Sequence, residues 1–144
     1  MHRILKRFRR KKKRERKMPK QVKLWTLQLA KWRIAEKRNL PKLDITVKSG
    51  LKYLAPDWDF LMDYKKSDKG PDAEAAYTKR YLQKLSRLFD EDTDKLIEIL
   101  RRGEVVLMCY CPPGKFCHRH LLVSYLIEIG EWFGYEVIYM GELS

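Results

Sequence analysis

The feature that most constrains the fold is a strand, turn, helix and strand pattern in the last third of the chain. Residues 105–110 form a continuous apolar run of the kind found in the centre of a parallel sheet. The turn CPPGKF follows, and an apolar stripe then predicts a helix over 117–133, which Gly134 ends. Residues 136–140 predict a last strand. This order predicts a βαβ unit, and so an α/β fold.

The rest of the body predicts further elements of the same class. Residues 22–29 and 43–47 predict strands, with a short helix over 30–38 between them. Residues 51–72 predict an irregular ordered insertion with one helical turn at 60–64. Two helices follow, one capped by Asp72 and one over 93–102. The expected fold is a small Rossmann-like sandwich with a mainly parallel sheet and a C-terminal βαβ unit.

Charge divides the chain into two parts. Of the first twenty residues, twelve are Lys or Arg and one is Glu, whereas the remainder has nearly equal numbers of basic and acidic residues. A run of like charges buries too little apolar surface to fold alone. We therefore expect a disordered basic arm over 1–20 and a single α/β domain over 21–144. Met18, where the charge run ends, is a possible internal start.

The arm predicts contact with phosphates, because clustered basic side chains bind DNA or RNA without regard to sequence. The predicted nucleic-acid-binding residues are Arg9, Arg10, Lys11, Lys12, Lys13 and Arg14. On this alternative, the protein is a nucleic-acid-associated accessory protein.

The cysteine content and the apolar runs suggest the compartment. Three cysteines, an odd number, are typical of a reducing environment, where thiols serve chemistry, metals or packing. The basic start lacks the apolar stretch of a secretory signal, and no run is long enough to cross a bilayer. We expect a cytoplasmic protein without a transmembrane segment.

The segment Cys109–His120 concentrates chemistry where a strand passes into a helix. In α/β proteins, ligands bind beyond the carboxyl ends of the strands, where helix amino termini attract anions. The residues predicted to bind a small anionic or nucleotide-like ligand are Cys111, Gly114, Lys115 and Arg119, and those predicted to be catalytic are Cys117, His118 and Arg119. Binding of this ligand is the preferred function, and a thiol or His118 could add proton transfer to it.

Two other interpretations use the same residues. Cys109, Cys111, Cys117 and His118 could bind zinc, although their spacing is not that of a standard finger or ribbon. Alternatively, Cys109 packs as a core residue, and His118 and His120 hydrogen-bond locally. A phosphatase-type cysteine loop is disfavoured, because seven residues separate Cys111 from Arg119 where that loop needs five.

The motif VVLMCYCPPGKFCHRHLL, together with WTLQLAKWRIAEKRNL, DITVKSG, LAPDW and YTKRYLQKL, resembles the domain of unknown function 488 family over about residues 21–144. The resemblance implies a Rossmann-like α/β sandwich with Cys117, His118 and Arg119 as core motif positions. It implies no established activity. The aromatic residues of the insertion are interpreted mainly as core, with Trp58 near a ligand cleft.

Overall fold

The computed structural model describes residues 20–144. All but the last residue of the basic arm, including Arg9, Arg10, Lys11, Lys12, Lys13 and Arg14, lies outside the described residues, as does Met18. None of the helices described is long and apolar enough to cross a membrane.

The centre of the fold is a four-stranded, all-parallel sheet with the order β2-β3-β1-β4. Its strands are β1 (Lys20–Gln28), β2 (Lys42–Asp44), β3 (Glu104–Cys109) and β4 (Tyr135–Glu142). Parallel strands need crossover connections, which are usually helical. These helices are α2 (Trp32–Lys37), preceded by a short 3₁₀ turn, α3 (Trp58–Lys66), α4 (Pro71–Glu91), α5 (Thr93–Arg101) and α6 (His118–Trp132).

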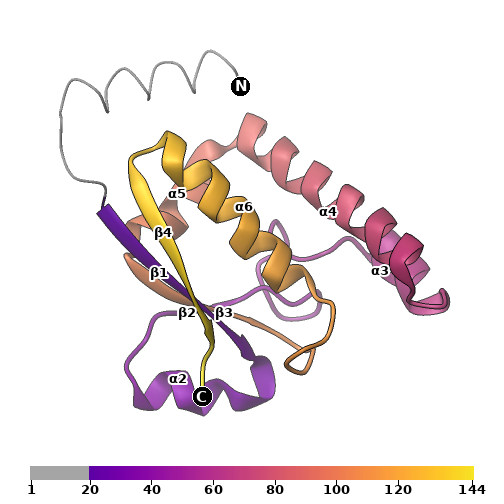
Figure 1. The fold of residues 1–144 in the computed structure, drawn as a ribbon, viewed down its shortest axis with the longest axis horizontal. Helices are drawn as coiled ribbons and strands as arrows, with labels where there is room; N and C mark the ends of the chain where they lie inside the picture. Colours follow the sequence, from indigo (N-terminus) through magenta and orange to yellow (C-terminus); the bar gives the residue numbers. More distant parts are fainter. Residues whose placement is uncertain (1–19) are drawn as a thin grey trace.

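This architecture is the predicted Rossmann-like sandwich with a C-terminal βαβ unit. In that unit β3, α6 and β4 follow one another, and β1 lies between the two strands. Figure 1 shows α4 and α6 on one side of the sheet and α2 on the other.

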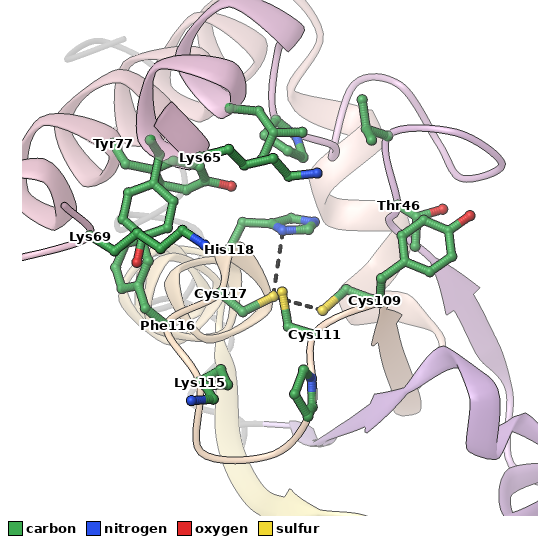
Figure 2. A pocket seen from close by; sticks show the side chains of 16 residues that line it. Thr46, Lys65, Lys69, Tyr77, Cys109, Cys111, Lys115, Phe116, Cys117 and His118 are labelled. Atoms are coloured by element: carbon green, nitrogen blue, oxygen red, sulfur yellow. Dashed lines mark hydrogen bonds between the residues drawn. The ribbon is translucent and has the colours of Figure 1, made fainter. Parts of the chain in front are cut away.

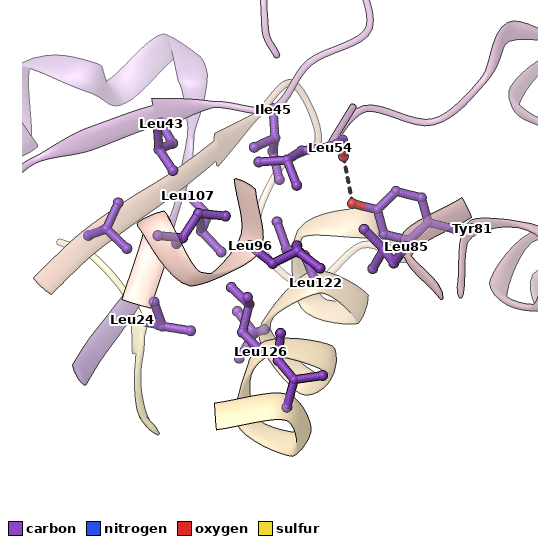
Figure 3. Close-up of a cluster of buried hydrophobic side chains, with 14 of the residues drawn as sticks. Leu24, Leu43, Ile45, Leu54, Tyr81, Leu85, Leu96, Leu107, Leu122 and Leu126 are labelled. Atoms are coloured by element: carbon purple, nitrogen blue, oxygen red, sulfur yellow. Dashed lines mark hydrogen bonds between the residues drawn. The ribbon is translucent and has the colours of Figure 1, made fainter. Parts of the chain in front are cut away.

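The sheet has apolar side chains on both faces, as parallel sheets do. On one face, Val105 and Leu107 of β3 pack in the larger core with residues of α4, α5 and α6 (Figure 3). On the other face, Val106 and Met108 pack in a small cluster with Ala35 of α2. The site is built on the side of the larger core.

The second strand is shorter than predicted, because the chain turns after Asp44 instead of continuing to residue 47. The Asp44 carboxylate accepts hydrogen bonds from the Thr46 backbone N–H, the Thr46 hydroxyl and the Ser49 hydroxyl. Such side-chain bonds to nearby groups compete with strand pairing. Ile45 still donates its backbone N–H to the carbonyl of Met108 at 3.0 Å, and the next two residues, Thr46 and Val47, leave the strand and line the cavity described below.

The insertion is more helical than predicted. Residues 58–66 form the full helix α3, whereas the sequence indicated one turn at 60–64. Helix α4 is capped by Gly70 and has Pro71 in its first turn, so Asp72 is not its cap. Proline suits this position because the first turn has no partner for its missing N–H. Buried Tyr77 and Tyr81 lie one helical turn apart on the inner face of α4.

Candidate functional site

A cavity of about 330 Å³ opens at the carboxyl ends of β2 and β3 (Figure 2). Its wall combines the residues that follow these two strands with side chains of α3 and α4 and with the loop 110–117. This position is where parallel α/β sheets bind ligands. The volume suits a small molecule.

One wall of the cavity is aromatic. The Tyr64 and Phe116 ring centroids are 5.2 Å apart, and Tyr77 contacts both rings at 5.6 and 5.2 Å, respectively. These rings come from α3, the loop and α4. They give the cavity a surface on which a flat ring can pack.

Three lysines line the same cavity. Lys65 belongs to α3, Lys69 to the turn before α4, and Lys115 to the loop, and all three are exposed (Figure 2). No Asp or Glu is found among the described residues that line the cavity. The site is therefore electropositive, which favours an anion.

The floor of the cavity is formed by thiols. The Sγ atoms of Cys109 and Cys117 are 2.7 Å apart, and the Cys117 Sγ is 3.6 Å from Nδ1 of His118. Cys109 and Cys117 are buried, and Cys111 is partly exposed. Hydrogen bonds from the Cys109 and Cys117 thiols lower the pKa of Cys111. The bond with Cys111 raises the pKa of Cys109, and the bonds with Cys109 and Cys111 raise the pKa of Cys117. Of the three, Cys111 is therefore the thiol that loses its proton most readily.

His118 joins the start of α6 to the end of β2. Its Nε2–H donates to the backbone carbonyl of Ile45 at 2.6 Å. Burial lowers the pKa of His118 to about 4, so the imidazole is neutral near pH 7. Because Nε2 holds the proton, Nδ1 presents its lone pair to the thiol of Cys117.

Arg119 is fully buried and lies behind the thiols, outside the cavity wall. Its guanidinium donates to Glu142 Oε1 at 2.8 Å, to Cys109 Sγ at 2.7 Å and to the carbonyl of Cys111 at 2.9 Å. A weaker bond reaches the carbonyl of Pro112 at 3.3 Å. These carbonyls turn towards Arg119, an arrangement unlike a loop whose amides surround an anion.

The structure brings most of the sequence-predicted residues together. Cys109, Cys111, Lys115, Cys117 and His118 line the cavity, whereas Gly114 and Arg119 do not. Gly114 has φ +80° at the exposed tip of the loop, a conformation that favours glycine. Cys109 is also part of the core.

Sequence reasoning missed the contribution of α3 and α4. Lys65, Lys69 and Tyr77 face the loop only because the insertion folds back over the sheet. Tyr64 was interpreted as a packing residue, and it does pack against the core while it also lines the cavity. The available signal was the unusual length and aromatic content of the insertion, since long ordered loops are often functional.

The three thiols are expected to differ in reactivity. In metal-free protein, iodoacetamide should modify Cys111 and spare the buried Cys109 and Cys117, because Cys111 is partly exposed and its pKa is lowered. An ordinary thiol loses about tenfold in rate per pH unit below its pKa. Because the pKa of Cys111 is lowered, its alkylation should fall less steeply than this between pH 8 and pH 6. Peptide mapping by mass spectrometry measures both, and preferential labelling of Cys109 would contradict the expectation.

Comparison with known protein families identifies the family of the chain. A family model described as the "Active DUF488-N3 subclade" matches residues 14–130, which include β3, the cysteine loop and most of α6. No curated protein and no solved structure matches the chain.

Proposed function

The chain belongs to the DUF488 family, and from that premise and the geometry of its cavity we propose that it binds a small anionic, nucleotide-like ligand at the cysteine loop. The observation that carries the proposal is the convergence of Lys65, Lys69 and Lys115 on a cavity with aromatic walls and no lining carboxylate. Lys65 and Lys69 come from the end of α3 and the turn that follows it, whereas Lys115 comes from the distant loop after β3. Their convergence brings three cations to one small opening.

The combination of rings and cations argues for the ligand class. An aromatic wall packs well against a flat ring such as a nucleobase, and ammonium groups bind phosphate or carboxylate oxygens as point charges. A simple phosphate would use the lysines but leave the apolar wall unpaired. A neutral aromatic compound would do the opposite. A nucleotide-like molecule uses both.

The thiols and His118 place reactive groups beside the proposed ligand. Cys111 is the partly exposed thiol of the floor, and in metal-free protein its lowered pKa makes it the nucleophile that a bound ligand would meet. Neutral His118 lies beside Cys117 and can exchange a proton with it. In this proposal Arg119 is a positioning residue, because it holds the carbonyls of Cys111 and Pro112.

Equilibrium binding of the four ribonucleoside 5′-monophosphates tests the proposal. Isothermal titration should detect at least one of them, and the double variant Lys69→Glu, Lys115→Glu should weaken that binding by at least about tenfold, or about 1.4 kcal/mol. Lys79→Glu is the matched control, because this exposed lysine of α4 lies outside the cavity.

The parent nucleosides without phosphate should bind more weakly than the monophosphates, and inorganic phosphate alone should also bind more weakly. Equal loss of affinity in the Lys79→Glu control would show that general surface charge, not the cavity, attracts the ligand. That result, or no binding by any of the monophosphates, would contradict the proposal.

A further inference from the structure

We propose that Cys109, Cys117 and His118 form a zinc site in the floor of the cavity, with one coordination position open to the cavity. The two Sγ atoms and one ring nitrogen of His118 lie within 4.8 Å of one another, and all three residues are buried. In the described part of the chain, no other group of three such donors is this close. The inference stands apart from the proposed nucleotide binding, because the donors lie together with or without that ligand.

The donor set matches zinc by its chemistry. Thiolate sulfur and imidazole nitrogen are the ligands that zinc prefers in proteins, and two Cys with one His occur in catalytic zinc sites. The sequence offered Cys111 as a fourth donor, but the structure groups only Cys109 and Cys117 closely with His118. This selection could not be made from the spacing of the cysteines.

The hydrogen bonds that would orient the metal ligands are already in place. Zinc-binding histidines usually donate their second N–H to a carbonyl or carboxylate, which fixes the ring. Here His118 donates Nε2–H to Ile45 and directs Nδ1 towards Cys117. Arg119 donates a hydrogen bond to the Sγ of Cys109 at 2.7 Å, so this second metal ligand is oriented as well.

The charges also balance. Two thiolates would neutralise a divalent cation, and the Arg119 guanidinium is paired with Glu142 at 2.8 Å. Burial of a charged group is costly unless it is paired or bound to a metal. With the metal, each of these buried charges has an opposite partner.

Three protein ligands leave the fourth position of a tetrahedral zinc free, which is the arrangement of catalytic rather than structural sites. Cys109, Cys117 and His118 all line the cavity, so the open position faces the space that a ligand would enter. Water or an anionic oxygen of a ligand would fill it.

Metal binding by the full chain, reduced and stripped of metal, tests the site without any nucleotide. One cobalt(II) per chain should bind and give a thiolate-to-metal charge-transfer band together with the strong visible bands of tetrahedral cobalt, and zinc should displace it. Cys117→Ala and His118→Gln should each lower zinc affinity by at least about a hundredfold in equilibrium dialysis. His120→Gln is the matched control and should bind as the wild type does.

Three results would count against the zinc site. Cobalt binding without a thiolate band, no binding by the wild type, or full affinity in folded Cys117→Ala protein would overturn the inference. If the variants lose their circular dichroism spectrum, the wild-type cobalt spectrum decides alone. The variant Lys69→Glu, Lys115→Glu should keep its zinc, so failure of nucleotide binding and failure of metal binding are distinguishable.

Discussion

Replacing Arg119 with leucine is expected to lower the free energy of unfolding by about 3–5 kcal/mol. Arg119 is fully buried, and its guanidinium satisfies Glu142 and two loop carbonyls. Leucine fills part of the volume but leaves the Glu142 carboxylate, which is only 24% exposed, without its cation. Urea denaturation followed by circular dichroism measures the loss. The loop 110–117 should also become more sensitive to proteases, because its carbonyls lose their donor.

The matched control is Arg80→Leu. Arg80 also binds two carboxylates, Asp59 and Asp63, but those groups are mostly exposed. Exposed ion pairs contribute about 0–1 kcal/mol, so this variant should unfold nearly as the wild type does. Similar destabilisation by the two substitutions would refute the structural role assigned to Arg119.

Gly50→Ala is expected to destabilise the protein by about 3 kcal/mol, because an added methyl group has no space. A Cβ at this position would lie 2.4 Å from the Asp44 carbonyl oxygen and 2.4 Å from the Thr46 nitrogen. Both are backbone atoms and cannot rotate away. Asp44 and Thr46, which would have to shift, lie on either side of Ile45, whose carbonyl accepts the His118 hydrogen bond. The site is therefore expected to loosen together with the turn. Thermal denaturation measures the change in stability.

Gly70→Ala provides the comparison for this substitution. A Cβ on Gly70 would meet only the side chain of Asp68, at 3.1 Å, and this exposed side chain can move. The expected change is below about 1 kcal/mol. If Gly50→Ala lowers stability as little as Gly70→Ala does, residue 50 does not lie this close to the backbone of Asp44 and Thr46.

Much of the fold follows from local sequence patterns. The apolar run of β3, the stripe of α6 and the glycine that ends it predict the βαβ unit, because each pattern reports burial of one element. The position of β1 between β3 and β4 has no local signal. It depends on pairing between residues about eighty or more positions apart, such as Leu24 with Val105.

The candidate site was predictable only in part, for the same reason. The cysteine loop is one continuous motif, so Cys111, Lys115, Cys117 and His118 were found from the sequence. Lys65 and Lys69 reach the cavity through the fold of the insertion. Arg119 was predicted as a ligand contact from its position in the motif, whereas its side chain points towards Glu142. The direction of a side chain at a helix start depends on tertiary partners that local patterns do not contain.

The most direct test of the central claim, that the cavity binds a nucleotide-like anion, is a nuclear magnetic resonance titration of ¹⁵N-labelled protein with adenosine 5′-monophosphate. We expect shifts that saturate and are confined to the amides around the cavity, chiefly those of Thr46, Tyr64, Lys69, Lys115 and Phe116. Shifts that map to another surface, or no saturable shift with this probe or the other three monophosphates, would contradict it.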